Sequence, residues 1–286
     1  MKDKNTQYNP LPQVNPPIYK PLIDSFKLSI LYKHCYNICP TLTEEYNKAY
    51  NIKYDQNGQV ISFDIDPEME KSRNKGQTID AITSRVYITE NNDNDKVHTK
   101  FITCTITAKM LKQEYWQGIT YENFPTIYQY IMSLNKFECT YETFLRSKTR
   151  DQDICLNVFA NLKTFLSMGK SLQEQSKHPH LFHFTNKFKK LNVGVQIGER
   201  DRCSPSKPFL KLYFKDYEMQ TKSAEFKSLY TPNVNTTDLC RLETTIANVK
   251  HKDYLIYHKV LPQWNTAEDF LKISQDDLMK FLKFST

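Results

Sequence analysis

Strict alternation of apolar and polar residues in short segments is the feature that most constrains the fold of this chain. In the segment FLKLYFK (209–215), Leu210, Leu212 and Phe214 alternate with Lys211, Tyr213 and Lys215. Successive side chains of a β-strand point to opposite faces. The segment therefore predicts a strand with an apolar core face and an opposite face formed by Lys211, Tyr213 and Lys215.

Two further segments repeat this pattern. Residues 239–246 place Arg241, Glu243 and Thr245 opposite an apolar row, and residues 151–158 place polar side chains opposite Ile154, Leu156 and Val158. The polar side chains of that second segment are Asp151, Asp153, Cys155 and Asn157. If the three strands pair in one sheet, their polar faces bring together a tyrosine, carboxylates, an arginine and lysines.

Other segments place this sheet in an α+β domain. Strand-like alternation also occurs at 22–32, 85–90, 98–108 and 190–200, and Asn57-Gly58 predicts a hairpin turn. Apolar residues three and four apart predict helices over 140–147 and 161–172, and two short helices over 108–135 interrupted at Gly118 and Pro125. Helices are also expected over 265–284, with Thr266 and Ser274 as capping residues. We expect a central antiparallel β-sheet flanked by helices.

Composition excludes several classes of protein. The 286 residues contain no apolar run long enough to cross a bilayer and no secretory signal, so we expect a cytoplasmic protein without a membrane partner. The seven scattered cysteines include no C-x-x-C pair, which argues against a disulfide framework or a zinc knuckle. The formal net charge of +7 suits a polyanionic partner, although basic residues also occur on ordinary solvated faces.

A tyrosine beside carboxylates and cations suits phosphoryl transfer. A phenol is a weak nucleophile at neutral pH and needs a nearby cation or metal to favour its anion. Carboxylates such as Asp153 and Glu243 can hold a hard divalent cation, Mg²⁺ or Mn²⁺, that neutralises charge on a phosphodiester. The alternative is an ordinary antiparallel sheet with one solvated face, where Tyr, Lys, Glu and Thr are common.

Tyr217 and a histidine cluster are competing candidates. Tyr217 shares the face of Tyr213 if that strand continues, or lies in a turn if it does not. The segment HPHLFHF contributes His178, His180 and His183. His180 and His183 have helical metal-pair spacing, whereas His178 and His180 share a face in a strand, and Pro179 disfavours a helix through this segment.

The ordered motifs resemble a known family. The run SPSKPFLKLYFKDYEMQTKSAEFKSLY, followed by CRLETTIANVKHKDYL, is similar to the core of the replication initiation proteins of small phages and plasmids. These are rolling-circle initiators with a single tyrosine and a divergent HUH-endonuclease-like, relaxase-like fold. The family pattern Y-x-K-x-x-E is met by Tyr213, Lys215 and Glu218, and the pattern R-x-E-x-T is met by Arg241, Glu243 and Thr245. The similarity runs in order from about 22 to 255.

The resemblance implies an enzyme that nicks and rejoins one DNA strand. Such initiators bind single-stranded or supercoiled origin DNA, form a 5′-phosphotyrosine with the help of a divalent cation, and leave a 3′ hydroxyl for a polymerase. It implies Tyr213 as nucleophile, with Tyr217 as competitor, and Lys215 as a phosphate contact or phenolate stabiliser. Candidate metal ligands are Glu243, Glu218, Asp153 and His183. Candidate DNA contacts are Arg200, Arg202, Lys207, Lys211 and Arg241.

The same resemblance suggests a division of the chain and a set of partners. We expect a proline-rich arm over 1–21, a nicking domain over 22–262 and a helical tail over 263–286. A host helicase and polymerase are implied partners, and the protein is expected to be a monomer or homodimer. The chain lacks a literal His-hydrophobic-His motif, because HPH places proline at its centre.

Three alternatives fit parts of the sequence. A conjugative or mobilisation relaxase uses identical chemistry, and no feature of the sequence separates it from a phage or plasmid initiator. A nucleic-acid-binding protein without catalysis would use the same basic and aromatic residues for neutralisation and stacking, independently of a metal. A virion structural protein would account for the many strands but not for the ordered pair of motifs.

Overall fold

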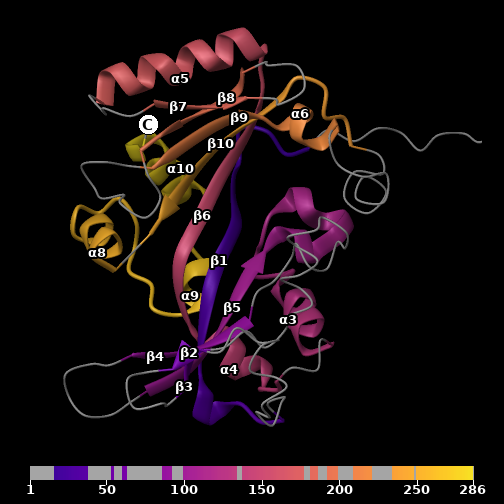
Figure 1. The fold of residues 1–286 in the computed structure, drawn as a ribbon, viewed down its shortest axis with the longest axis vertical. Helices are drawn as coiled ribbons and strands as arrows, with labels where there is room; N and C mark the ends of the chain where they lie inside the picture. The colour runs from indigo at the N-terminus through magenta and orange to yellow at the C-terminus, as the bar shows by residue number, and fades with distance from the viewer. Residues whose placement is uncertain are drawn as a thin grey trace, which may run out of the picture.

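An antiparallel sheet of eight strands forms the centre of the protein, in the order β4-β5-β1-β6-β10-β9-β8-β7 (Figure 1). The computed structural model describes residues 16–37, 53–54, 60–62, 86–91, 99–133, 137–176, 181–185, 192–198, 209–220, 234–247 and 249–285. The strands are β1 (Pro21–Leu31), β4 (Val86–Asn91), β5 (Thr99–Thr107), β6 (Lys148–Phe159), β7 (Leu181–Thr185), β8 (Asn192–Ile197), β9 (Leu210–Phe214) and β10 (Leu239–Ile246).

The expected α+β fold with a central antiparallel sheet flanked by helices is confirmed. Each predicted strand segment contains a strand of this sheet. In addition, β2 (Lys53–Tyr54) pairs with β3 (Val60–Ser62) as the predicted hairpin requires, while the Asn57-Gly58 turn lies outside the described residues. Figure 1 shows the long strands β1 and β6 running through the middle of the molecule.

Helices pack on the sheet because its strands present apolar rows. Helix α5 (Leu162–Ser176) packs on β8 and β9, where Val195 and Leu212 are fully buried. Helices α9 (Ala267–Leu271) and α10 (Gln275–Ser285) pack on β6 and β1. The ring of Phe26 in β1 lies 5.8 Å from that of Phe270 in α9, so the C-terminal helices share the core of the sheet.

The remaining helices connect and cover the strands at several points. They are η1 (Tyr32–His34), η3 (Ala108–Gln117), α3 (Phe124–Ser133), α4 (Tyr141–Leu145), α6 (Lys215–Gln220) and α8 (Val249–Tyr257). Within the described ranges, none is both long and apolar enough to cross a bilayer.

Helix boundaries test the sequence predictions closely. Thr266 and Asp269 form the expected capping box of α9, and the Ser274 hydroxyl caps α10 by accepting from the backbone N–H of Asp277. Gly118 does end η3, with a positive φ of 71°. The expected interruption at Pro125 is wrong, because Pro125 is the second residue of α3, where its missing N–H costs no helical hydrogen bond.

A buried histidine gives the fold a pH-dependent stability. His251 in α8 is 2% exposed, and burial lowers its pKa from the ordinary value of about 6.5 to about 4. As pH falls from about 6.5 towards 4, the unfolded chain binds this proton and the folded chain does not. We expect His251 to account for a loss of at most about 3 kcal/mol in the free energy of unfolding across this window.

Urea unfolding of the wild type and His251→Gln at pH 7.5 and pH 4.5 measures this effect. The variant should lose less stability on acidification than the wild type. His258→Gln is the matched control, since His258 lies at the end of the same helix but is exposed, and its pH dependence should equal that of the wild type. Equal acid sensitivity of wild type and His251→Gln contradicts the assignment.

Candidate functional site

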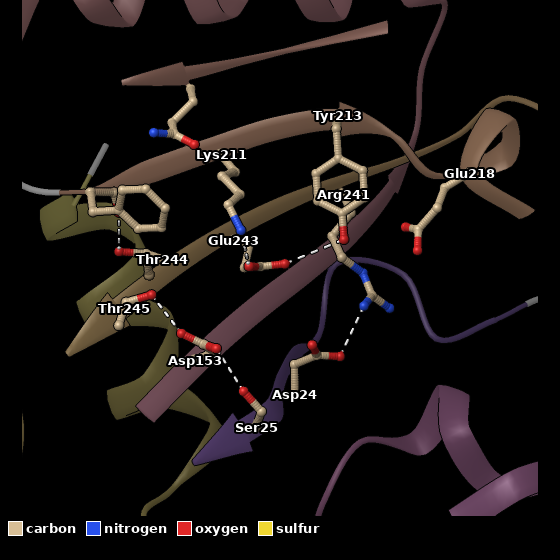
Figure 2. A network of polar contacts seen from close by, with 12 residues as sticks. Asp24, Ser25, Asp153, Lys211, Tyr213, Glu218, Arg241, Glu243, Thr244 and Thr245 are labelled. Atoms are coloured by element: carbon tan, nitrogen blue, oxygen red, sulfur yellow. Dashed lines mark hydrogen bonds and ion pairs between the residues drawn. The ribbon is translucent and has the colours of Figure 1, made fainter. Parts of the chain in front are cut away.

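Two neighbouring rows of side chains cross the polar face of the central strands. Tyr213 of β9 is paired with Arg241 of β10, which is paired with Asn157 of β6. In the next row Lys211 is paired with Glu243. Paired residues of an antiparallel sheet share a face, so the sheet brings these side chains together. The predicted assembly of the three polar strand faces is therefore confirmed (Figure 2).

Glu243 holds Tyr213 and Lys211 in one hydrogen-bonded group. The Tyr213 hydroxyl donates to Oε2 of Glu243 at 3.3 Å, and Lys211 Nζ contacts Oε1 at 3.0 Å. Burial raises the pKa of the Tyr213 phenol well above its ordinary value, and the Glu243 carboxylate raises it further. Tyr213 is therefore a neutral hydrogen-bond donor at neutral pH, with a carboxylate placed to accept its proton.

Strand β9 ends immediately after Tyr213 and Phe214. Lys215 begins helix α6, so the prediction that the strand includes Lys215 is wrong. The helical spacing brings Glu218 back to Lys215, whose Nζ lies 2.7 Å from Oε2 of Glu218. The buried Lys215 ammonium also lies 5.6 Å from the ring centroid of Tyr213, which is within cation–π range.

Tyr217 lies on α6 and not on the strand. A helical residue two positions beyond Lys215 does not follow the alternation of β9, so Tyr217 reaches the site from a different element than Tyr213 does. Its half-buried side chain lines a pocket that Tyr213 also lines. Both candidate tyrosines therefore border one pocket, and of the two only Tyr213 bonds Glu243 among the described side-chain hydrogen bonds.

Arg241 is buried beneath the site. Its side chain is 1% exposed, Nε donates to Asn157 Oδ1 at 2.9 Å, and Nη1 donates to Asp24 Oδ1 and the Tyr115 hydroxyl at 3.0 Å each. Its guanidinium also lies 5.8 Å from the ring centroid of Trp116. Arg241 therefore has no exposed guanidinium with which to make the expected DNA contact. It instead links β10 to β1, β6 and η3.

A β-bulge in β1 places Asp24 in this network. Ile23 pairs with Ile154 and Ser25 pairs with Asp153, so Asp24 is an extra residue between two consecutive pairs. Ser25 then donates to Asp153 Oδ2 at 2.6 Å, and Thr245 donates to Oδ1 of the same carboxylate at 2.5 Å. Figure 2 shows Asp24 and Ser25 both directed towards the polar face.

A pocket of about 590 Å³ opens above this face between β9, η3 and α6. Its lining combines phenols, ammonium groups and carboxylates. The charged and phenolic lining residues are Asp24, Lys109, Tyr115, Lys211, Tyr213, Lys215, Tyr217, Glu218 and Glu243. Such a pocket can place an anionic group against Tyr213 with cations on either side.

The predicted metal ligands fit a divalent cation only in part. Glu218 and Glu243 line the pocket, and Mg²⁺ is commonly bound by one or two carboxylates together with water and substrate phosphate. Both carboxylates already contact lysines, and the described part of the chain holds no cluster of three or more His, Cys, Asp or Glu side chains suited to a metal. Asp153 is occupied by two hydroxyls and does not line the pocket.

Among the described residues, His183 is placed on a different row of the sheet from Tyr213. His183 lies on β7, and the register pairs it with Val195, which is paired with Leu212. Its position therefore belongs to the row of Leu212 and not to that of Tyr213. Outside the described residues lie His178, His180, Arg200, Arg202 and Lys207.

Sequence reasoning missed Asp24, Tyr115 and Lys109. The alternation within a single segment does not show where a strand carries one extra residue. The sequence therefore did not predict that Asp24 would lie in a bulge and reach Arg241. One signal was available. An arginine in a strand between apolar residues requires a buried carboxylate partner, and Asp24 is the only acidic residue in the predicted first strand, 22–32.

Comparisons with known proteins give one distant similarity. No protein-family model matches the chain, and no curated protein sequence matches it. Among solved structures, the fold is similar to one titled "Structure of Rolling Circle Replication Initiator Protein from Geobacillus stearothermophilus". That match has 11% sequence identity and a TM-score of 0.35, and it covers 85% of this chain and 80% of the other.

Proposed function

We propose that this protein is a replication initiator that nicks and rejoins one strand of origin DNA through a covalent phosphotyrosine. The observation that carries the proposal is the hydrogen bond of 3.3 Å from Tyr213 to Glu243, inside a pocket that also contains three lysines. A phenol next to a proton acceptor, surrounded by cations, has the parts that attack on a phosphodiester requires. The sequence motifs Y-x-K-x-x-E and R-x-E-x-T support the same assignment.

Four pocket residues have direct roles in the proposed reaction. The Tyr213 proton passes to Oε2 of Glu243 while the phenolic oxygen attacks phosphorus. The bond between phosphorus and the 3′ oxygen breaks and the 5′ phosphate stays on Tyr213. The 3′ oxygen leaves as a hydroxyl after taking up a proton from water, and Glu243 returns the Tyr213 proton to water. Lys211 and Lys215 offset the negative charge that accumulates at the phosphate. Rejoining is the reverse of these steps.

A divalent cation belongs to the proposal. Mg²⁺ or Mn²⁺ bound by Glu218 and Glu243, together with substrate oxygens, would supply further neutralisation of the phosphate charge. Arg241 acts beneath the pocket by fixing Asp24 and Tyr115. The origin sequence, a phage or plasmid source and contacts with a host helicase or polymerase remain expectations from the family resemblance.

A covalent-adduct assay tests the proposal. Purified protein is incubated with single-stranded and supercoiled DNA of its replicon and Mn²⁺ or Mg²⁺, and products are separated under denaturing conditions. We expect a protein–DNA adduct, suppressed by a chelator, whose digestion yields a nucleotide-bearing peptide that contains Tyr213. DNA binding without an adduct on either substrate would instead support the non-catalytic binding protein.

Replacing Glu243 by glutamine is expected to slow adduct formation by about 10²- to 10⁴-fold, the range typical for loss of a general base. Glutamine keeps the shape of the side chain but cannot take the Tyr213 proton. Single-turnover rates with excess protein measure the change. Glu268→Gln is the matched control, because Glu268 also contacts a lysine, Lys272 at 2.6 Å, but lies on α9 outside the pocket. A Glu243→Gln rate within threefold of the wild type would contradict the proton-acceptor role.

A further inference from the structure

Gly194 of β8 lies directly beside Tyr213, where almost any other residue would collide with β9. The register pairs Gly194 with Tyr213, so the row across the sheet reads Gly194, Tyr213, Arg241 and Asn157. A Cβ atom at position 194 would lie 2.7 Å from Cβ of Tyr213, 2.8 Å from the carbonyl oxygen of Leu212 and 2.9 Å from Cα of Tyr213. Normal cross-strand Cβ atoms are about 4.5–5.5 Å apart.

The glycine is required by this close approach and not by its own backbone angles. Gly118 and Gly198 have positive φ values, whereas Gly194 does not. Glycine inside a strand weakens the strand, and its presence often marks a point where another backbone comes close. The three atoms that a methyl group would meet belong to the backbone or to Cβ, so rotation of a flexible side chain cannot relieve the overlap.

The opposite face of the sheet prevents β8 from moving away. Val195 and Ile197 of β8 are 1% and 2% exposed, and α5 packs on β8 and β9, where Gly169 lies close to Val195 and Leu212. A Cβ at Gly169 of α5 would lie 2.3 Å from Cγ2 of Val195, which shows how closely this helix approaches β8. On its far side β9 is bounded by β10, where Arg241 is held by Asp24, Asn157 and Tyr115.

We infer that Gly194 is a positioning residue for Tyr213, because its missing side chain sets how close β9 lies to β8 and thus where the phenol meets Glu243. The expected effect of Gly194 on the reaction rate rests on the proposed function. The steric contact between Gly194 and Tyr213 is independent of that function. A methyl group at position 194 shifts β9 at Leu212 and Tyr213. The shift changes the 3.3 Å contact between the Tyr213 hydroxyl and Glu243.

Gly194→Ala is the test, with Gly169→Ala as its matched control. Both variants add one methyl group against the β8–β9 pair, one beside Tyr213 and the other from the α5 side. Misplacement of a reacting group by about 1 Å can cost about 10²-fold in rate. We expect Gly194→Ala to lower the single-turnover rate of adduct formation by about 10- to 100-fold without weakening DNA binding more than about twofold, and Gly169→Ala to change the rate less than about threefold.

A second readout separates this inference from the proposed function. Protein labelled with 3-fluorotyrosine gives ¹⁹F resonances, and Tyr213→Phe identifies that of Tyr213. Gly194→Ala should move the Tyr213 resonance, and Gly169→Ala should not. If the wild type forms no adduct but the resonance moves, Gly194 positions Tyr213 and the proposed function fails. If the Gly194→Ala variant matches the wild type in both rate and resonance, the inference is overturned.

A third variant covers the case in which Gly194→Ala does not fold. The double variant Gly194→Ala/Tyr213→Gly removes the Cβ atom that would be nearest to the new methyl group. Recovery of a cooperative thermal transition in the double variant supports the conflict with Tyr213. Failure of the double variant to fold, while Tyr213→Gly alone folds, overturns the assignment of the conflict to the Tyr213 side chain and places it at the backbone of β9, where the Leu212 carbonyl oxygen and the Tyr213 Cα lie 2.8 Å and 2.9 Å from the new methyl group.

Discussion

Tyr213→Phe is expected to abolish the covalent protein–DNA adduct while leaving the fold and DNA binding intact. The substitution removes a single oxygen atom, so the half-buried ring of Tyr213 still packs against the ammonium group of Lys215, the first residue of α6. The lost hydroxyl is the attacking group of the proposed reaction. Without it, residue 213 has no oxygen atom that can bond phosphorus, and a water molecule that attacks in its place would not link the protein to DNA. Denaturing electrophoresis after incubation with DNA and Mn²⁺ measures the loss.

Tyr217→Phe is the matched control for this experiment. Tyr217 lines the same pocket but belongs to α6, and it has a comparable half-buried side chain. The adduct should persist in Tyr217→Phe, with a rate within about tenfold of the wild type, since a pocket-lining hydroxyl contributes at most a hydrogen bond of about 1.5 kcal/mol. An adduct that survives Tyr213→Phe and disappears with Tyr217→Phe would transfer the nucleophile to α6.

The two tyrosines differ in how firmly the fold places them. Tyr213 is paired on both sides within the sheet, with Gly194 on β8 and Arg241 on β10, and its hydroxyl bonds Glu243. Tyr217 lies on a helix of six residues. A nucleophile must be held close to one orientation, and a residue inside a sheet is better suited to this than one on a short helix. The geometry therefore favours Tyr213 independently of the sequence motif.

Alternation was sufficient to predict which side chains share a face of the sheet. Lys211, Tyr213, Arg241, Glu243 and Asn157 meet as expected, because a period of two is local to each strand and antiparallel pairing preserves it. The register that aligns Tyr213 with Arg241 could not be read from any one segment. That alignment depends on which strands are neighbours, and the order β6-β10-β9 joins strands far apart in the sequence.

The departures from prediction occur where the chain leaves regular geometry. Alternation continues through Lys215, yet α6 begins there, and the helical pairing of Lys215 with Glu218 replaces the strand. A local pattern does not reveal such an end when the residues after it also suit a helix. The bulge at Asp24 and the burial of Arg241 have one cause, because the extra residue in β1 supplies the carboxylate that the arginine needs.

Arg241 therefore connects the stability of the fold with the geometry of the pocket. Lys215 and Arg241 lie 5.5 Å and 5.6 Å from the ring centroid of Tyr115, so this ring on η3 contacts one cation of the pocket and one beneath it. Tyr115 and Asp24 also line the pocket, and both accept from the same guanidinium nitrogen. The wall that η3 and β1 contribute to the pocket therefore depends on a buried residue.

Arg241→Met is expected to lower the free energy of unfolding by about 3 to 5 kcal/mol, the range for breaking a buried ion pair by removing one partner. Methionine fills part of the space but leaves the Asp24 carboxylate and the Asn157 and Tyr115 oxygens without this donor. Urea unfolding followed by far-ultraviolet circular dichroism measures the change. Arg146→Met is the matched control, because Arg146 contacts Glu142 at 2.6 Å with both side chains about two-thirds exposed. Its cost should be below about 1 kcal/mol.

A second substitution at Asp24 identifies the source of this loss. In Asp24→Asn/Arg241→Met the uncompensated charge is gone, so the double variant should be more stable than Arg241→Met alone, although less stable than the wild type because Asn157 and Tyr115 still lack their donor. Arg241→Lys should also be destabilised, since one ammonium group cannot bond partners on three elements as the planar guanidinium does. If Arg241→Met costs no more than Arg146→Met, the buried guanidinium does not hold η3 and β1 to the sheet, and the pocket wall must be fixed by apolar packing alone.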